Sequence, residues 1–469
     1  MIIEQIYTGC LAQGAYFIAS NGEAAIIDPL REVKPYLDKA EKAGARIKYI
    51  FETHFHADFV SGHIDLSRAT GAPIVYGPQA TPSFEALIAT DGQVFQIGKL
   101  TLQVLHTPGH TLESSCYLLK DEAGVPVALF SGDTLFLGDV GRPDLAQKSN
   151  ELTMEDLAGM LYDSLTQKIL PLPDNIMVYP AHGAGSACGK NMMKETMDTL
   201  GNQKKMNYAL NQPNKKAFTE AVLDGLSAPP AYFPLNVNMN KHGYDSFGAV
   251  MERGLIPLTA DRFEAAVEST GAVVIDTRAG AEFAKGFVPR SINIGLKGDF
   301  APWAGAVLGD VTQPVLLVCD PGSEAEVITR LARVGIDQVL GYLNGGFSTW
   351  LLAGKEVDTV TRISAQDFVN RLGNKPMVID VRRDSEYAAQ HVEDAYHRSL
   401  AEFNSWMPLL DRNQAFVLHC QSGYRSMIAA SIFLARGYRN FVEVEGGFKA
   451  IAEAGAPTTD FMCQSKVAI

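Results

Sequence analysis

The stretch Thr53–Asp58 constrains this chain more than any other part of its sequence. It directly follows a mostly apolar run, residues 47–51, which predicts a buried strand, so the hexapeptide is predicted to be the turn at that strand's carboxyl end. His54, His56 and Asp58 alternate along this turn, and a bent loop can aim all three side chains at one point. Imidazoles and a carboxylate that converge in this way are what a divalent transition metal requires.

Three further polar residues stand at the ends of apolar stretches downstream. His110 follows residues 100–105, Asp133 follows 125–130, and His182 follows 176–178. Polar residues that each come directly after an apolar strand describe a site built along one edge of a sheet.

In this order, the motifs H-x-H-x-D, PGHT, SGDT and PAHG resemble the metallo-β-lactamase family, whose fold is an αββα sandwich. The resemblance covers about residues 1–200 and implies an α/β fold there. One position departs from the pattern: the family's hydrolases have a histidine after the aspartate, which binds a second zinc, whereas this chain has Phe59. Because a phenyl ring cannot donate to a metal, we expect the second metal site to be empty or absent.

The first metal site then keeps His54, His110 and Asp133 as its predicted ligands. Two histidines and one carboxylate are the ligand set of non-haem Fe(II) oxygenases, which leaves open positions for substrate and dioxygen. Within the fold, this set is similar to the persulfide dioxygenase branch, and the resemblance implies one Fe(II) per chain. A zinc site on His54, His56 and His110 stays open as an alternative. The remaining residues that are predicted to support the metal or to bind it are His56, Asp58 and His182.

Two residues near the predicted metal site are candidates for binding substrate. Arg142 lies in a loop, residues 138–144, that should roof the metal pocket, and its guanidinium can pair bidentately with a substrate carboxylate. Loops of this G-R-x-D type occur in the persulfide dioxygenases; the alternative is an ion pair with Asp139 or Asp144. Cys188 either carries or orients sulfane sulfur, or is buried among small residues as apolar filler.

The last 215 or so residues contain an internal repeat of about 105 residues. The run 273–278, with its D-x-R motif, returns at 377–382, and the Gly-Gly-Phe at 345–347 returns at 446–448. Alternation of strands and helices predicts two mainly parallel sheets, each covered on both faces. The D-x-R-x-x-x-E and GGF motifs resemble the rhodanese fold in both copies.

The second copy has the sequence of an active sulfur-transfer loop. A cysteine between an apolar strand and a helix lies in a ring of backbone N–H groups at the positive end of the helix dipole, which favours a thiolate and binds anionic sulfur. The C-x-x-G-x-R-S pattern resembles the active loop of single-domain rhodaneses. It predicts Cys420 as the nucleophile and Arg425 as a fixed cation, with the substrate held by the loop residues Gln421, Ser422, Gly423 and Tyr424.

The first copy is predicted to be inactive and structural. Around Cys319 its loop has Asp320, Glu324 and Glu326 and no arginine, so anionic sulfur would be repelled. The loop is also expected to be shorter than that of the second copy. Cys319 could occupy either the strand end or the catalytic position, because the alignment of the repeats is ambiguous by one residue.

Composition sets the outer limits of these expectations. A length of 469 residues with 46% hydrophobic residues is enough for about three domains. The predicted domains are 1–250, the metallo-β-lactamase-fold domain with a helical extension that begins with a helix over 190–208, then 251–358 and 359–469, the two rhodanese-like domains. A net charge of −13 with both signs interspersed argues against nucleic-acid and anionic-membrane partners.

No apolar run approaches the roughly 20 residues that cross a bilayer, so a cytoplasmic location is expected. Six cysteines without a C-x-x-C pair argue against a disulfide framework. Separately, we expect the chain to form a homo-oligomer.

Together the parts resemble persulfide dioxygenase–sulfurtransferase fusions, which detoxify sulfide and persulfide. The resemblance implies oxidation of a low-molecular-weight thiol persulfide by O2 to sulfite, coupled to sulfur transfer through Cys420 that makes or uses thiosulfate. A zinc-dependent thioester hydrolase similar to hydroxyacylglutathione hydrolase, with an accessory sulfurtransferase, is the alternative enzyme. A persulfide-sensing adaptor with a structural metal is a third reading. The sequence leaves open which thiol carries the persulfide: glutathione, coenzyme A or bacillithiol.

Overall fold

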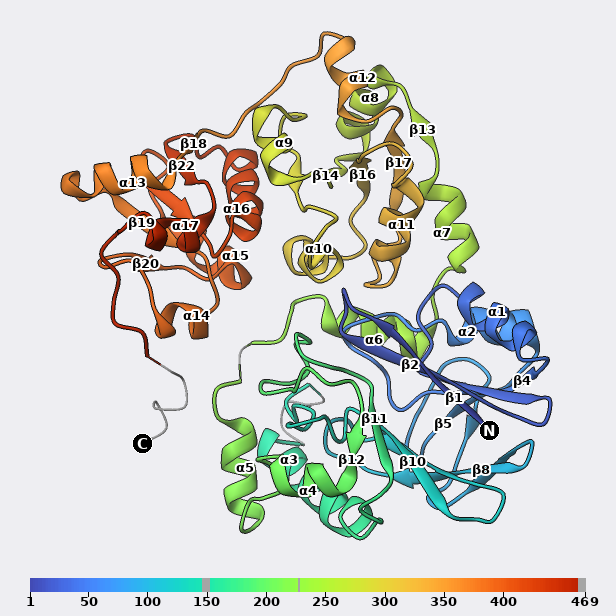
Figure 1. Cartoon of the computed structure of the whole chain (residues 1–469). Coiled ribbons are helices and arrows are strands. Elements are labelled where there is room, and N and C mark those ends of the chain that lie inside the picture. Colours follow the sequence, from blue (N-terminus) through green and yellow to red (C-terminus); the bar gives the residue numbers. More distant parts are fainter. Residues whose placement is uncertain (146–151, 227, 463–469) are drawn as a thin grey trace. The chain divides into compact units, whose positions relative to one another are not determined.

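The structure, a computed structural model, describes residues 1–145, 152–226 and 228–462. The chain divides into two compact units, the first made mainly of Met1–Phe247 and the second of most residues from Gly248 onward (Figure 1). Within the described ranges, no helix is both long and apolar enough to cross a membrane.

The first unit contains two six-stranded sheets that pack face to face. The order of strands in the first sheet is β1 (Ile2–Thr8), β2 (Gln13–Ser20), β3 (Glu23–Ile27), β4 (Arg46–Phe51), β5 (Ile74–Tyr76) and β6 (Leu87–Ile88). The order in the second is β12 (Asp198–Thr199), β11 (Met177–Pro180), β10 (Pro126–Gly132), β9 (Ser115–Lys120), β8 (Leu100–His106) and β7 (Val94–Ile97). One apolar core joins the inner faces, with Tyr16, Phe51, Val104 and Phe130 among its buried residues.

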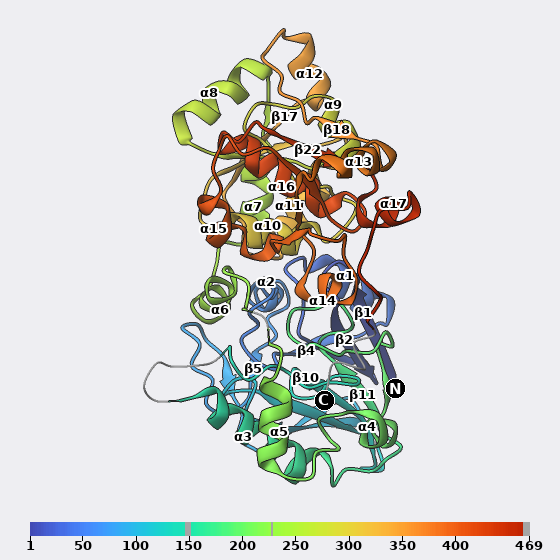
Figure 2. The same cartoon turned by 90° about the vertical axis from the view of Figure 1, so that its left-hand side faces the viewer.

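Helices cover the outer faces of both sheets. The helices of this unit are α1 (Lys34–Lys42), α2 (His63–Thr70), α3 (Met154–Ser164), which continues into a π-helical turn at Leu165–Ile169, α4 (Leu200–Met206), α5 (Lys215–Leu223) and α6 (Phe233–His242). Tyr36 of α1 and Leu66 of α2 pack on the first sheet, and Leu161 of α3 packs on the second. Helices α3 and α5 lie side by side (Figure 2). The layers are therefore the αββα sandwich that the motifs implied, and this fold class is confirmed.

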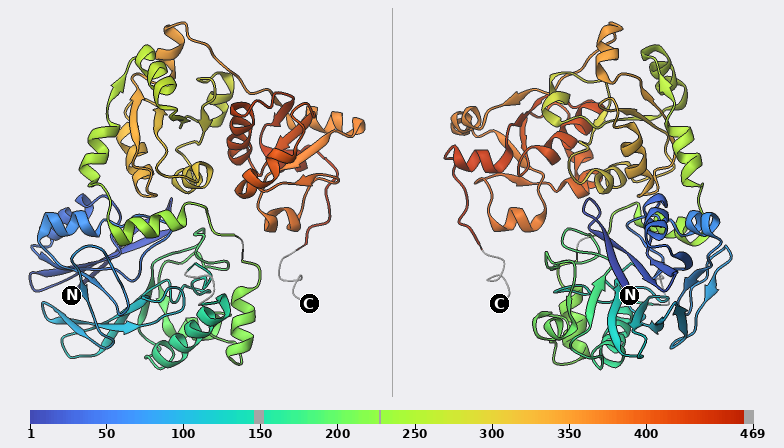
Figure 3. Two further views of the ribbon diagram at one scale, coloured as in Figure 1. Left: turned by 180° about the vertical axis from the view of Figure 1, so that it is seen from behind. Right: turned by 45° about the vertical axis from the view of Figure 1, so that its right-hand side comes forward.

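The second unit holds the two repeat copies, drawn from yellow-green to orange and from orange to red (Figure 3). The first copy has five parallel strands in the order β13 (Pro257–Leu258), β17 (Val339–Leu343), β16 (Val315–Val318), β14 (Val273–Asp276) and β15 (Ile292–Asn293). The second repeats this order with β18 (Arg362–Ile363), β22 (Phe441–Val444), β21 (Phe416–His419), β19 (Met377–Asp380) and β20 (Tyr396–His397). The prediction of two rhodanese-like α/β domains is confirmed.

The helices of the second unit alternate with these strands along the chain. In the first copy they are α7 (Phe247–Gly254), α8 (Ala260–Thr270), α9 (Gly280–Lys285), α10 (Phe300–Leu308), α11 (Glu324–Ala332) and α12 (Phe347–Leu352). In the second copy they are α13 (Ala365–Arg371), α14 (Asp384–Ala389), α15 (Phe403–Trp406), α16 (Tyr424–Ala435) and α17 (Gly447–Glu453), with single 3-10 turns at Leu372–Asn374, Leu400–Glu402 and Met407–Leu409.

The repeated D-x-R and GGF motifs form one structural unit in each copy. Asp380 accepts hydrogen bonds from the Arg382 guanidinium, which lies 4.1 Å from the ring centroid of Phe448. Asp276, Arg278 and Phe347 repeat this arrangement, again with 4.1 Å between guanidinium and ring. The aspartate is fully buried in both copies, at the carboxyl ends of β14 and β19. The arginine of the motif therefore supplies the opposite charge that a buried carboxylate needs.

Candidate metal site and sulfur-transfer site

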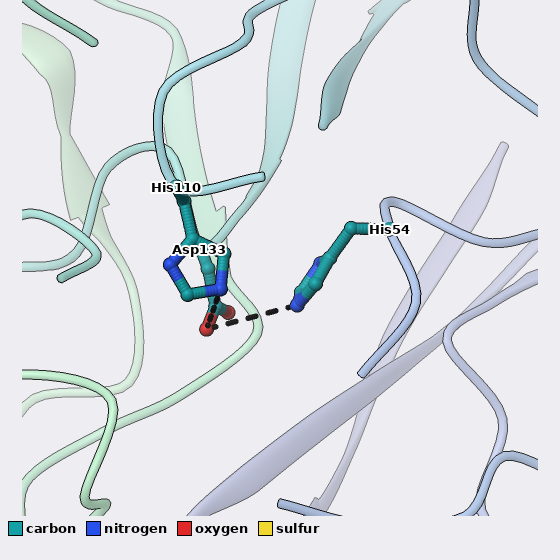
Figure 4. Close-up of side chains that lie close together, drawn as sticks. All are labelled: His54, His110 and Asp133. Atoms are coloured by element: carbon teal, nitrogen blue, oxygen red, sulfur yellow. Dashed lines mark ion pairs between the residues drawn. The ribbon is translucent and has the colours of Figure 1, made fainter. Parts of the chain in front are cut away.

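Three strand ends bring the predicted metal ligands together. His54 follows β4, His110 follows β8 and Asp133 follows β10, and all three are buried. The Asp133 Oδ2 atom lies 3.4 Å from Nε2 of His110 and 3.9 Å from Nε2 of His54. In Figure 4 both imidazoles point toward the carboxylate. One ligand atom from each residue lies within 4.8 Å of the other two, which is a spacing that a single ion can bridge.

Hydrogen bonds behind the two histidines orient them. His54 Nδ1 is 3.0 Å from Thr53 Oγ1, and Thr53 is itself held by Asp28. His110 Nδ1 is 2.8 Å from the backbone oxygen of Arg142. Each ring thus uses Nδ1 in the protein and leaves Nε2 for a ligand, as in most metal-binding histidines. Neither oxygen of the buried Asp133 carboxylate accepts a hydrogen bond from the described residues, so the donor set fits a cation.

His56 is engaged by other acids. Its Nε2 atom lies 3.1 Å from Asp28 Oδ1 and 3.3 Å from Glu52 Oε2, and its ring stacks on Phe59 with centroids 4.2 Å apart. Burial lowers the pKa of His56, but the two carboxylates outweigh it and raise the pKa to about 10. Within the described ranges, no group of ligand atoms at ion-binding spacing joins His56 to His54 and His110.

Asp58, His182 and Cys188 surround a neighbouring point. His182 Nε2 is 3.3 Å from Asp58 Oδ2 and 3.7 Å from Asp133 Oδ1, so the two oxygens of Asp133 face different histidines. The Cys188 sulfur lies at ion-binding spacing with Asp133 and His182, and Asp58 does so with His182 and His56. Burial and the carboxylates of Asp58 and Asp133 raise the pKa of the Cys188 thiol to about 12. The thiol is therefore protonated at neutral pH unless a cation binds beside it.

Arg142 is buried and paired within its own loop. Its Nε and Nη2 atoms donate to the two oxygens of Asp144 over 2.7 and 2.6 Å, and Nη1 donates to the Ala187 oxygen over 3.2 Å. This is the ion-pair alternative that the sequence left open. The contact of Arg142 with the metal site is its backbone oxygen on His110, and a role of its guanidinium in binding substrate stays a prediction.

The loop that follows Cys420 curls back toward the cysteine sulfur. Cys420 directly follows β21, and the N–H of Gly423 donates to Cys420 Sγ over 3.2 Å. Gly423 has φ = 103°, a conformation that glycine adopts without strain, and α16 begins at the next residue. The second glycine of the GGF motif packs under the loop, since a Cβ on Gly447 would lie 2.5 Å from the Cys420 carbonyl oxygen.

The remaining loop side chains have partners. Arg425 makes two hydrogen bonds to Glu386, of 2.5 and 2.7 Å, and Gln421 accepts one of 3.1 Å from Arg382. Tyr424 donates over 2.8 Å to the carbonyl oxygen of Gly295 in the first copy. The Ser422 backbone nitrogen lies beside Gly447, 2.8 Å from where a Cβ on that glycine would be. The fixed cation predicted at Arg425 is thus held in place by the glutamate of the D-x-R-x-x-x-E motif.

Strand register settles the position of Cys319. Asp276 of β14 pairs with Val318, and Asp380 of β19 pairs with His419, so Cys319 and Cys420 are equivalent. The expectation of a shorter loop in the first copy is wrong. Helix α11 begins five residues after Cys319, whereas α16 begins four residues after Cys420. Burial and nearby acids, Glu324 foremost, raise the pKa of Cys319 to about 12, in keeping with the predicted inactivity of this copy.

The sequence analysis missed Asp28 and Glu52, which hold the metal loop from behind. Both are buried acids at the ends of apolar strands, Asp28 after β3 and Glu52 after β4. An acid directly after an apolar strand was the signal used for Asp133, and it would have identified these two as well.

Family models match most of the chain. Residues 8–182 match the metallo-beta-lactamase superfamily, and residues 259–353 and 364–454 each match the rhodanese-like domain. A metallo-beta-lactamase from Staphylococcus aureus subsp. aureus COL is a structural neighbour at 32% identity and a TM-score of 0.67, with 73% of this chain and 98% of that chain covered. ETHE1 from Myxococcus xanthus is similar at 27% identity and a TM-score of 0.44, with 51% and 98% covered.

Curated relatives match a little more than a third of this chain. Hydroxyacylglutathione hydrolase of Tolumonas auensis is 34% identical over 171 residues, which are 36% of this chain and 60% of that protein. The enzyme of Polaromonas sp. is 35% identical over 188 residues, 39% of this chain and 66% of that protein. The chain thus spans 60 to 66% of the length of these relatives.

Proposed function

We propose that this chain, which belongs to the metallo-β-lactamase superfamily and continues into two rhodanese-like domains, oxidises a low-molecular-weight thiol persulfide to sulfite with O2 and transfers sulfane sulfur through Cys420. The oxidation would take place at one non-haem Fe(II). The observation that supports the proposal most is the grouping of two histidines and one carboxylate at one point, with His56 held by Asp28 and Glu52. That set suits Fe(II) and leaves part of its coordination open.

Each residue of the first site has a definite task in this proposal. His54, His110 and Asp133 would hold Fe(II), which when bound supplies the coordination positions and electrons through which persulfide sulfur and O2 react. Thr53 and the Arg142 carbonyl keep the two imidazoles aimed at that point. Cys188 lies beside Asp133 and His182, from where its sulfur can contact and orient the incoming persulfide. The reaction balances as persulfide plus O2 plus one water giving thiol plus sulfite, so the buried site must admit one water together with the persulfide and O2.

The second site would carry sulfur covalently. The Cys420 thiolate attacks the sulfane sulfur of thiosulfate, the S–S bond breaks, sulfite leaves with the electron pair, and a cysteine persulfide remains. In the opposite direction, sulfite attacks the outer sulfur of that persulfide and thiosulfate is made. Donation from the Gly423 N–H and the start of α16 stabilise anionic sulfur at Sγ. Sulfite and persulfide are shared by both reactions, and the tether between the domains raises the effective concentration of each site for the other.

A zinc-dependent thioester hydrolase with an accessory sulfurtransferase is the second candidate. It is favoured by the curated relatives, which are hydroxyacylglutathione hydrolases. Phe59 counts against it, because a two-metal hydrolase needs a ligand there, and so does the engagement of His56 by acids. An adaptor with a structural metal ranks third, since structural zinc sites close all four positions with cysteine and histidine.

Oxygen uptake tests the proposal. The Fe(II)-loaded chain should consume O2 on addition of glutathione persulfide or coenzyme A persulfide and should release sulfite or thiosulfate, whereas a zinc-loaded control should not. Asp133→Ala should lose metal and O2 uptake but keep sulfur transfer, and Cys420→Ser should lose sulfur transfer but keep O2 uptake. Hydrolysis of S-lactoylglutathione without any uptake would favour the zinc thioesterase. The cytoplasmic location and the homo-oligomer stay predictions.

A further inference from the structure

A carboxylate with no role in the reactions above lies beneath the Cys420 loop. Glu443 is the third residue of the short strand β22 (Phe441–Val444), and its side chain is fully buried. A Cβ on Gly423 would lie 3.8 Å from Glu443 Oε1, so the carboxylate borders the loop itself. Burying an ionisable group is costly unless it is paired, so its partners indicate its task.

Ser426 connects Glu443 to the nucleophile. The Ser426 hydroxyl lies 2.7 Å from Glu443 Oε1 and 3.4 Å from Cys420 Sγ, and it is fully buried. The hydroxyl has one hydrogen, which it can donate to Cys420 Sγ or, over the shorter distance, to Glu443 Oε1. When it donates to Glu443, its oxygen is free to accept the hydrogen of the thiol. The three groups therefore form a continuous chain from sulfur to carboxylate that is closed to water.

Charged and titratable groups lie at both ends of this chain, and the loop is also bordered by Arg382, which bonds Gln421 and Asp380, and by His419, which precedes Cys420. On the carboxylate side, Arg362 of β18 donates from Nε to Glu443 Oε2 over 2.8 Å and also pairs with Glu445. On the sulfur side, Arg425 of α16 faces Cys420 and is held by Glu386 of α14. Burial raises the pKa of Glu443, against the opposing effects of Ser426 and Arg362, so this carboxylate takes up a proton more readily than an exposed glutamate.

The first copy lacks both members of the chain. Strand register places Tyr342 where the second copy has Glu443, because Leu317 pairs with Tyr342 and Leu418 pairs with Glu443. Ser426 is the third residue of α16, and the third residue of α11 is Glu326, which has no hydroxyl. The carboxylate and the hydroxyl thus occur together in the copy whose loop carries the arginine, and neither occurs in the other.

We propose that Glu443 accepts the proton of the Cys420 thiol through Ser426 and returns it when the sulfur is discharged. This inference rests on the proposed sulfur transfer at Cys420. In the first step, the thiol proton moves to Ser426 Oγ and the Ser426 hydrogen moves to Glu443, which leaves a thiolate and a carboxylic acid. The thiolate then takes the sulfane sulfur and sulfite leaves. When an acceptor anion such as cyanide or sulfite removes the outer sulfur, the electron pair of the broken S–S bond stays on Sγ, and the proton returns.

The pH profile of thiosulfate:cyanide sulfur transfer by the full chain tests this relay. Without Glu443, the loop N–H groups and the start of α16 still favour the thiolate, so Glu443→Gln should lower kcat at pH 7 by less than the roughly 30-fold that an ordinary cysteine, about 3% thiolate, would set as a limit. KM for thiosulfate should be unchanged. The loss should disappear at alkaline pH, where hydroxide from the solvent replaces the carboxylate as proton acceptor. Ser426→Ala should give the same profile, Ser426→Thr should retain activity, and the double variant should be no slower than either single one.

Glu445→Gln is the matched control. Glu445 pairs with the same Arg362 but is half-exposed and does not contact Ser426, so this variant should behave as the wild type. A purely structural role of Glu443 would give a loss of equal size at all pH values. That result, or no loss at all, would overturn the relay.

Alkylation of Cys420 by iodoacetamide tests the relay without any sulfur chemistry. Two groups that share one proton titrate in two linked steps, so the alkylation rate should rise in two steps with pH in the wild type and in one step in Glu443→Gln. A single step with the same midpoint in both proteins would contradict the relay. A wild type that shows two steps but transfers no sulfur would refute the proposed function of Cys420 and leave the relay standing.

Discussion

Phe59→His should convert the first unit from a one-metal to a two-metal protein. Phe59 occupies the position at which the family's hydrolases bind a second zinc, and its ring centroid lies 6.4 Å from that of His182. Asp58, His182 and the Oδ1 atom of Asp133 already lie around that position. An imidazole at residue 59 would add the missing donor to these three.

The cost of the substitution follows from the burial of Phe59. Its side chain is fully buried and stacked on His56, so losing the phenyl ring should cost about 2 kcal/mol in the metal-free protein. For a domain of this size that lowers Tm by about 4–8 °C. Zinc at about 100 times its Kd stabilises the native state by about 2.7 kcal/mol and should restore Tm.

Metal analysis and thermal unfolding check both parts of this prediction. The variant should bind two zinc ions per chain where the wild type binds one, and its Tm should rise with zinc more than that of the wild type. Phe59→Leu, which loses the ring but adds no donor, should show the loss of stability and no second ion. If Phe59→His still binds one zinc, Phe59 is not what keeps the second position closed, and the reasoning fails.

Three further predictions concern the rhodanese-like copies. Cys319 should stay unmodified by iodoacetamide at pH 8 in the native chain because its pKa is raised to about 12; peptide mass spectrometry showing modification as fast as at Cys420 would contradict this. Gly298→Ala should destabilise the protein by about 1–3 kcal/mol in urea unfolding, since the new Cβ would lie 2.8 Å from the Tyr424 ring, whereas Gly373→Ala, which meets open space, should not. Burial raises the pKa of Glu386, but the Arg425 pair outweighs it and holds the pKa below its usual range. Glu386→Gln should therefore cost about 1 kcal/mol at pH 7, and the difference from the wild type should vanish as pH falls to about 3.

Patterns within short stretches of sequence predicted most of the elements that build the two sites. The apolar runs before His54, His110 and Asp133 are strands β4, β8 and β10, and each ligand follows its strand as expected. The repeat of D-x-R and GGF predicted two copies with the same order of strands. These features are local, since hydrophobic periodicity and chain-reversing residues act over a few positions.

One local expectation was wrong. Residues 190–208 were expected to form a helix, but α4 spans only Leu200–Met206. Asp198 and Thr199 instead form strand β12, which pairs with Met177 and Val178 of β11. The backbone groups on the open side of β11 need hydrogen-bond partners, and pairing with β12 supplies them. This pairing outweighed the helical propensity of the stretch.

The partners of several polar side chains were decided by the tertiary structure. His56 has the spacing of a metal ligand, yet Asp28, which lies 28 positions before it in the sequence, is brought beside it by the pairing of β3 with β4. In the same way, Ala187 accepts a hydrogen bond from Arg142, and strand register makes Cys319 equivalent to Cys420. The sequence by itself determined the layers, the repeat and the residue types at the strand ends. Which carboxylate the His56 imidazole or the Ser426 hydroxyl faces depends on contacts between distant segments, and these form only when the sheets pair and pack. The pairs of Arg142 with Asp144 and of Arg382 with Asp380 are local, because their members are two positions apart.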